Sequence, residues 1–345
     1  MSERQLFVFW QFNGDNSSQC NQKCPYCYGG IKENKHYWSG DIDKWEKAWE
    51  RLGRDIYFVF SYGESLCAKG FYECVEMIGR HPTWTLCIVS NMLCDPSRLI
   101  ESRLACEGRL FISACWHPLG VENRVEGWEN FKTNILKLKA AGVPMNVMYL
   151  WYPPQIGWFP EYFRWLDSND FRVSVRRFVG AYGGVKLPFS GRRLGGKCYP
   201  RDYSEAEQGY IYAYSSPKVA KYGLRLVPPK GKFCTAGKDL ILVKYNGDVS
   251  LCADTENTTH LGNIFDADFK LSPLGCVCPN NICGGDYGML HLFDPEFGDL
   301  PERLTNEPFV SQVMSTKQSH PVQYKKREEM LFWIDKLRKE GEKKK

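Results

Sequence analysis

The stretch SSQCNQKCPYCYGG, residues 17–30, places three cysteines close together, at Cys20, Cys24 and Cys27. A structural disulfide joins two cysteines, and a closed structural zinc site takes four ligands. A set of three thiols fits neither pattern. The metal or cofactor that these three thiols bind must therefore be inferred from the position of this segment in the predicted fold.

The composition sets the first limits on function. The chain has 345 residues, of which 43% are hydrophobic and 25% charged, and no apolar run approaches the roughly 20 residues of a membrane helix. Its first residues do not form a secretory signal, so we expect a cytoplasmic protein without a membrane partner. Fifteen cysteines in that reducing compartment indicate metal or redox chemistry. The net charge of +5 is too small to predict a nucleic-acid partner.

Alternating apolar and amphipathic segments predict an α/β fold. Asp41 is the expected N-cap of the first helix, in which Trp45 and Trp49 share one apolar face. The predicted strands are 5–12, 55–60, 84–90, 109–115, 143–150 and 171–179. The predicted helices are 41–53, 71–79, 95–104, 126–142 and 159–168. Such alternation predicts a parallel sheet with right-handed crossovers.

Three polar motifs follow the first three predicted strands. The cysteine loop comes after the first strand, SYGES at 61–65 after the second, and SNM at 90–92 after the third. Functional groups on parallel sheets lie at the carboxyl ends of the strands. We therefore expect these motifs to meet at one edge of the sheet.

The spacing Cys20-x3-Cys24-x2-Cys27, with Tyr26 before the last cysteine, resembles the cluster motif of radical SAM enzymes. The resemblance implies a partial (β/α)6 barrel in which three thiolates hold a 4Fe–4S cluster. S-adenosylmethionine then binds the remaining iron through its amino and carboxylate groups. The alternative is a zinc knuckle that takes a fourth ligand such as His36.

The resemblance also implies roles for the other polar residues of this edge. Gly63 and Glu64 match part of the segment that bonds the methionine amino group, although their neighbours differ from the commonest form. His117 either faces the substrate or is structural. The cofactor-binding residues implied in this way are Tyr26, Gly63, Glu64, Ser90, Asn91 and Ser113.

A second cysteine group follows residue 233, with Gly247 and Asp248 predicting a hairpin turn between two short strands. This region resembles the SPASM and twitch domains, so the resemblance implies a shortened α+β domain with one auxiliary 4Fe–4S cluster. The alternative is a zinc ribbon. The cysteines of this group are Cys234, Cys252, Cys276, Cys278 and Cys283.

Five cysteines exceed the four ligand positions of one cluster. Which four bind the cluster stays open. We expect Cys276 and Cys278 to point to opposite faces, and we hypothesise that Cys276 is a catalytic hydrogen-atom donor that is not a ligand; the alternative is a buried thiol with no role. The predicted auxiliary ligands are then Cys234, Cys252, Cys278 and Cys283. The other cysteines are predicted to fill the apolar core: Cys67, Cys74, Cys87, Cys94, Cys106, Cys115 and Cys198.

The predicted domain organisation has four parts. Residues 181–232 are an irregular connection that either covers the substrate or acts as a linker, with a helical piece at 204–214. The C-terminal extension is expected to end in a basic helix. The four parts are the radical SAM barrel at 1–180, the connection at 181–232, the auxiliary cluster domain at 233–290 and the extension at 291–345.

The resemblance implies that the enzyme cleaves S-adenosylmethionine reductively and abstracts hydrogen from its substrate. A flavodoxin- or ferredoxin-type reductant is the implied partner. The chain begins 19 residues before Cys20, which leaves no room for a peptide-leader module, so we favour oxidation or epimerisation of a sugar- or cyclitol-like small molecule. The alternatives are a maturase of ribosomal peptides and a non-catalytic iron–sulfur protein that transfers electrons.

Overall fold

The structure is a computed structural model that describes most of the chain up to residue 295. No helix in the described part is long and apolar enough to cross a membrane. His36, Cys198 and the predicted C-terminal helix lie outside the described residues. The described ranges are 5–14, 20–27, 38, 40–179, 199–215, 217–223, 227–252, 259–281, 283 and 291–295.

All six predicted barrel strands are confirmed. They run parallel as neighbours in chain order, within a nine-stranded sheet of order β10-β9-β8-β1-β2-β3-β4-β5-β6. The six strands are β1 (Leu6–Gln11), β2 (Ile56–Phe60), β3 (Thr85–Ser90), β4 (Leu110–Trp116), β5 (Met145–Trp151) and β6 (Val173–Arg177).

The strands read as nearly continuous apolar runs because both faces of the sheet are covered. In β1, Leu6, Val8 and Trp10 pack into the large core on the helical side. The alternate residues, Phe7 and Phe9, belong to a second cluster on the opposite, inner face of the sheet. The inner face is therefore the face available for a site inside the barrel.

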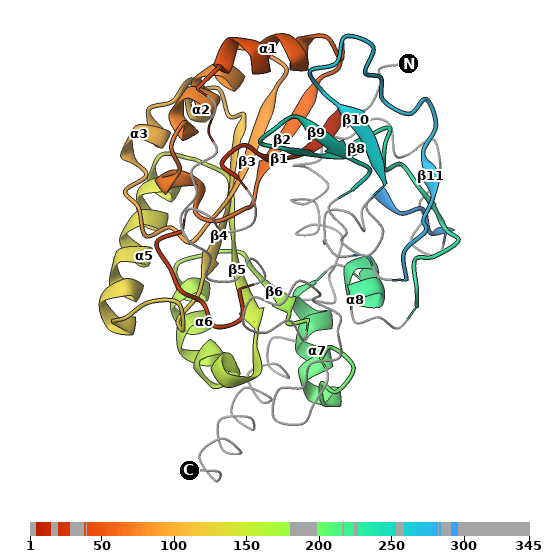
Figure 1. Cartoon of the computed structure of the whole chain (residues 1–345). Helices are drawn as coiled ribbons and strands as arrows, with labels where there is room; N and C mark the ends of the chain where they lie inside the picture. The colour runs from red at the N-terminus through yellow and green to blue at the C-terminus, as the bar shows by residue number, and fades with distance from the viewer. Residues whose placement is uncertain are drawn as a thin grey trace.

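Helices α1, α2 and α6 begin where the sequence predicts, whereas α5 begins at Arg124, two residues before its predicted start. Asp41 caps the first by accepting a hydrogen bond from the Lys44 backbone N–H at 3.0 Å. Figure 1 shows the larger helices of this half along one side of the curved sheet. The helices are α1 (Ile42–Glu50), α2 (Phe71–Arg80), α3 (Ser97–Ile100), α4 (Arg103–Cys106), α5 (Arg124–Ala140) and α6 (Phe159–Ser168), with 3-10 turns η1 (Ser65–Cys67) and η2 (Pro153–Trp158).

One helix prediction was wrong in its extent. The segment 95–104 was expected to be a single helix, but it forms the two short helices α3 and α4. The Ser102 side chain accepts a hydrogen bond from the Ala105 N–H, which starts a new helix at that point. A serine that caps a helix interrupts the preceding turn, and the apolar pattern alone does not show this.

The connecting segment contains two helices, α7 (Glu205–Tyr214) and α8 (Pro217–Gly223). The helical piece predicted at 204–214 is confirmed as α7, which begins with a capping box between Ser204 and Glu207. The Tyr203 hydroxyl, just before this helix, donates to the Trp151 carbonyl at the end of β5. Figure 1 shows α7 and α8 beside the β6 end of the sheet.

The C-terminal hairpin extends the barrel sheet and does not form a sheet of its own. Strand β8 (Leu240–Lys244) pairs in parallel with β1, and the predicted turn at Gly247 leads into β9 (Asp248–Ser250). Strand β10 (His260–Asn263) forms the edge. A separate antiparallel pair joins β7 (Phe233–Cys234) to β11 (Cys276–Val277). The shared sheet places β8 beside β1 and carries Cys252, which follows β9.

Candidate active site

The polar motifs at the carboxyl edge meet around one carboxylate. The Ser90 hydroxyl donates to Glu64 Oε1 at 2.8 Å, and the Asn91 backbone N–H donates to Oε2 at 2.7 Å. The Asn91 side-chain amide in turn donates to Asn21 Oδ1 at 2.6 Å. Asn21 follows Cys20 in the chain. The carboxyl ends of β2 and β3 are thus linked to the cysteine loop through Glu64, Asn91 and Asn21.

Glu64 is fully buried and held in place from three directions. Besides Ser90 and Asn91, the Leu66 backbone N–H donates to its Oε1 at 3.2 Å. Burial raises the pKa of Glu64 to about 7, and these hydrogen bonds oppose that rise. A positively charged or strongly donating ligand group at this edge would favour the ionised carboxylate. Gly63, just before it, has φ of +62°, a conformation that suits glycine.

The first three cysteines form a compact, half-buried turn. The Cys27 backbone N–H donates to the Cys24 carbonyl at 3.0 Å. Burial raises the pKa of Cys20 to about 11 and that of Cys24 to about 12, and neighbouring thiols of the same group add to both shifts. Cys20 and Cys24 therefore lie in poorly hydrated surroundings, and Cys27 is close enough to contribute to both shifts. Bound metal cations would stabilise their thiolate forms.

The loop after β4 comes very close to this turn. A Cβ atom on Gly120 would lie only 2.5 Å from the Cys24 sulfur, so only glycine leaves room for the thiol. Gly120 also accepts a hydrogen bond from the Lys23 N–H at 3.3 Å. The fold therefore keeps space around the Cys24 thiol, as a metal–thiolate bond requires.

Tyr26, the aromatic residue of the cysteine motif, is buried in the barrel. Its hydroxyl lies 3.0 Å from His117 Nδ1, and its ring centroid lies 4.7 Å from that of Tyr152. Burial lowers the pKa of His117 to about 4, so this histidine is neutral at physiological pH. His117 therefore positions Tyr26 beside the cysteine turn.

Ser113 lies deeper on the sheet than the Glu64 network. Its hydroxyl donates to Asn146 Oδ1 at 3.0 Å, and the Asn146 amide donates to the Ser174 hydroxyl at 3.0 Å. These bonds form a polar ladder across β4, β5 and β6. Asn146 and Ser174 were not among the predicted site residues, although a single polar residue within an otherwise apolar strand is a signal for such a ladder.

The five C-terminal cysteines all lie against the inner-face cluster that includes Phe7, Phe9, Leu240 and Leu242. Apolar surroundings of this kind shield a metal cluster from solvent. One apolar cluster is thus contacted by thiols that are separated by up to 49 residues of sequence, from Cys234 to Cys283. They are Cys234, Cys252, Cys276, Cys278 and Cys283.

The expected orientation of Cys276 and Cys278 was wrong. Successive side chains of an extended chain alternate, so residues two apart point to the same face. Val277, between them, is 66% exposed, whereas both cysteines pack against the inner cluster. Cys276 also pairs with Cys234 across β11 and β7. A hydrogen bond from the Cys234 thiol lowers the pKa of Cys276 to about 7.

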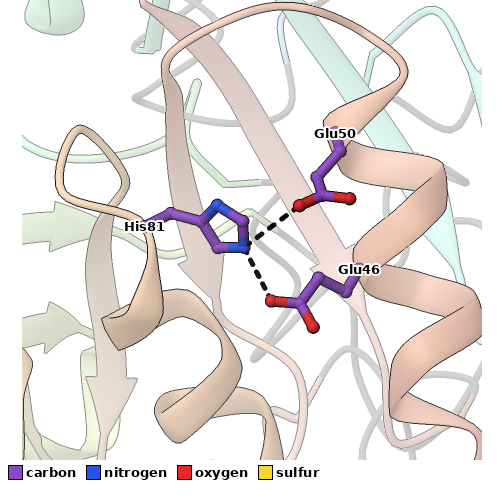
Figure 2. A group of neighbouring side chains, drawn as sticks. All are labelled: Glu46, Glu50 and His81. Atoms are coloured by element: carbon purple, nitrogen blue, oxygen red, sulfur yellow. Dashed lines mark hydrogen bonds and ion pairs between the residues drawn. The ribbon is translucent and has the colours of Figure 1, made fainter.

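One group of metal-type ligands on the helical side proves to be an ion-pair cluster. Within the described part of the chain, Glu46, Glu50 and His81 have donor atoms within 4.8 Å of one another (Figure 2). His81 Nε2 lies 2.7 Å from Glu46 Oε1, and Arg80 donates two hydrogen bonds to the same carboxylate. The guanidinium already neutralises Glu46 and repels a cation. This group joins α1 to the end of α2.

The remaining cysteines divide into two classes. Cys74, Cys87 and Cys115 are buried, as predicted. The prediction was wrong for Cys67 and Cys106, which are exposed, and for Cys94, which is half-buried. Cys67 and Cys94 follow β2 and β3, where the chain has left the sheet, so the apolar context of the strands does not extend to them.

Comparisons with known proteins support the fold assignment. No protein-family model and no curated protein sequence matches the chain. Among solved structures, anSMEcpe with bound AdoMet has a TM-score of 0.53 at 16% identity, over 76% of this chain and 78% of that chain. The complex of anSMEcpe with AdoMet and the Kp18Cys peptide has a TM-score of 0.54 at 16% identity, over the same shares.

A second protein gives a similar match. Streptococcus suis SuiB bound to S-adenosylmethionine has a TM-score of 0.53 at 14% identity, over 79% of this chain and 67% of that chain. At such low identity the likeness concerns the fold, and it agrees with the parallel strand order and the cysteine loop after β1. The chain therefore has the partial-barrel fold of the radical SAM enzymes.

Proposed function

We propose that the protein is a radical SAM enzyme whose first cluster is a 4Fe–4S centre held by Cys20, Cys24 and Cys27. The observation that carries the proposal is the hydrogen-bonded link from Glu64 through Asn91 to Asn21, next to the cysteine turn. A cluster in that turn would lie close to a carboxylate that is buried and already oriented. The proposed recognition of S-adenosylmethionine would use this pairing, with the cluster and Glu64 on either side of the methionine amino group.

A cluster held there would supply the electron for reductive cleavage of S-adenosylmethionine, and hydrogen abstraction from the substrate would follow from that cleavage. The protein's own residues bind and orient the cosubstrate. Glu64 accepts a hydrogen bond from the methionine amino group. The Ser90 hydroxyl and the Asn91 backbone N–H hold the Glu64 carboxylate in position for this contact. Ser113 contributes a buried polar surface deeper in the barrel.

We propose a second, auxiliary 4Fe–4S cluster held by four of the five C-terminal cysteines. The support is their common position against the inner face and the adjacency of Cys234 and Cys276. A cluster there would accept an electron from a substrate radical and so favour net oxidation. If one thiol stays unligated, it could donate a hydrogen atom to the substrate radical and so give epimerisation. The thiyl radical left on sulfur would then take one electron from the reductant and one proton from solvent.

We propose a polar small molecule, sugar- or cyclitol-like, as the substrate. The polar ladder of Ser113, Asn146 and Ser174 supports this choice, because it offers hydroxyl and amide groups inside an otherwise apolar barrel. A peptide is the second candidate, since anSMEcpe has been solved with the Kp18Cys peptide and SuiB with the precursor peptide SuiA. An iron–sulfur electron carrier would use neither substrate.

One assay distinguishes these functions. The anaerobically reconstituted protein is reduced with S-adenosylmethionine in the presence of a panel of cyclitols, sugars and peptides, and 5′-deoxyadenosine is measured. We expect formation above the substrate-free rate with a member of the small-molecule panel. If only peptides increased 5′-deoxyadenosine formation, the small-molecule proposal would be rejected and the protein would be assigned as a peptide maturase. Absence of 5′-deoxyadenosine under all conditions, with both clusters present, would reject the enzyme and favour a carrier.

A further inference from the structure

Two cysteines that belong to neither predicted cluster lie in direct contact beside the Glu64 network. The sulfurs of Cys67 and Cys94 are 2.6 Å apart. Cys67 is exposed and Cys94 is half-buried, so small molecules in solvent can reach the pair. The two residues are 27 positions apart in the sequence and come together because β2 and β3 are neighbours.

The backbone of Cys67 is fixed by the same carboxylate that forms the candidate active site. Cys67 ends η1, whose first turn is capped by Glu64 through the Leu66 N–H at 3.2 Å. The Cys67 N–H donates to the Glu64 carbonyl at 3.1 Å. The thiol is therefore carried on a short, well-anchored turn.

The backbone of Cys94 is fixed from helix α5. The Asn134 amide donates to the Met92 carbonyl at 2.9 Å and to the Cys94 carbonyl at 3.1 Å. The Asn130 amide donates to the Leu93 carbonyl at 3.1 Å. Because both cysteines are held by their own anchors, the contact between the thiols is a property of the fold.

The contact makes the two sulfurs unequal. Either thiol can donate to the other, and this contact lowers the pKa of Cys94 and raises the pKa of Cys67. Thiolates, not thiols, attack disulfides. The Asn21 side-chain amide also donates to the Cys94 sulfur at 3.6 Å and so stabilises a thiolate there. This contact assigns Cys94 as the attacking sulfur of the pair and Cys67 as the sulfur that completes the reaction.

We propose that Cys67 and Cys94 form a dithiol site that is reversibly oxidised to an intramolecular disulfide by low-molecular-weight disulfides. The Cys94 thiolate attacks one sulfur of the disulfide, forms a mixed disulfide and releases one small thiol. Cys67 loses its proton to solvent and attacks the Cys94 sulfur, which releases the second small thiol. The two protein thiols are oxidised and the small disulfide is reduced to two thiols.

The site adjoins the candidate active site but does not depend on its function. The Asn21 amide donates to the Cys94 sulfur at 3.6 Å, and the same side chain accepts from Asn91. Oxidation of the pair would therefore change the hydrogen bond that Asn21, the residue after Cys20, donates to the Cys94 sulfur. The chemistry itself needs neither a cluster nor S-adenosylmethionine, so it can be tested separately from the proposed function.

The test uses the full-length, iron-loaded protein under anaerobic conditions. The protein is equilibrated in buffers of increasing glutathione disulfide to glutathione ratio, alkylated, and digested with trypsin. We expect peptides 55–69 and 81–98 to appear as a linked pair that loses two hydrogens, to increase with the ratio, and to disappear on reduction. Absence of the linked pair at the most oxidising ratio would overturn the proposal.

Matched serine variants assign the roles of the two sulfurs. We expect Cys67→Ser to accumulate a glutathione mixed disulfide on Cys94, and Cys94→Ser to leave Cys67 largely unmodified. Cys106→Ser changes an exposed cysteine elsewhere and should leave the linkage intact. Persistence of the link in Cys94→Ser would assign it to Cys87, the other cysteine of peptide 81–98, and would contradict the proposal. Circular dichroism and iron content confirm that each variant is folded and loaded.

Discussion

The affinity for S-adenosylmethionine should depend on the ionisation of Glu64. Burial raises the pKa of this carboxyl to about 7 in the unliganded protein, and only the ionised form accepts the amino group without first losing a proton. Binding is therefore favoured above this pKa and weakened below it. For one group with a pKa near 7, the ionised fraction falls from roughly nine tenths at pH 8 to roughly one tenth at pH 6. The apparent affinity should fall about tenfold across that range.

The variant Glu64→Gln distinguishes the contribution of Glu64 to the pH dependence of binding from the contribution of ionisable groups on S-adenosylmethionine. Loss of a charge-assisted hydrogen bond of about 1.5–3 kcal/mol should weaken binding roughly ten- to hundred-fold at pH 8 and remove the protein's share of the pH dependence. Anaerobic calorimetry of the iron-loaded protein at pH 6, 7 and 8 measures both effects. Glu50→Gln, an exposed change on α1, is the matched control and should bind like the wild type. Equal pH profiles for the wild type and Glu64→Gln would refute the reasoning.

Three further predictions concern the metal sites. The reconstituted protein should hold about eight irons, because it is expected to carry two cubane clusters of four irons each. When the three motif cysteines are changed together to Ala, about four irons should remain. Zinc in the C-terminal group would contradict this count. Gly120→Ala should lower iron in the first site, because its Cβ would lie 2.5 Å from the Cys24 sulfur, whereas Gly157→Ala, with nothing within 4 Å, should load normally. Cys276→Ala should remove about four irons because Cys276 lies beside Cys234. Unchanged iron, with loss of product deuteration in deuterated water, would instead favour Cys276 as hydrogen donor.

The sequence predicted the barrel strands and their order well because each strand is an apolar run between helical patterns. It also predicted that the cysteine loop, Glu64 and Asn91 would share one edge, since parallel strands end together. The hydrogen bonds among them could not be predicted. They depend on Asn21, whose position in the cysteine loop gives no sign that its amide reaches Asn91.

Contacts between segments that are distant in the sequence were the features that could not be predicted from it. Nothing local in 240–244 indicates that β8 pairs in parallel with β1, because its apolar pattern fits any position in the sheet. The contact between Cys67 and Cys94 likewise depends on the register of β2 and β3 and on the short turns after them. The orientation of Cys276 and Cys278 could have been predicted, because strand alternation places residues two apart on the same face.

The most direct test of the central claim is the electron paramagnetic resonance spectrum of the reduced first cluster with and without S-adenosylmethionine. The measurement uses a variant without the auxiliary cysteines, so that only the cluster of Cys20, Cys24 and Cys27 contributes. If this cluster has an iron that the cosubstrate binds next to Glu64, the spectrum must change when S-adenosylmethionine is added, and the change must require more ligand in Glu64→Gln. A reduced cluster whose spectrum is the same at saturating S-adenosylmethionine would contradict the account.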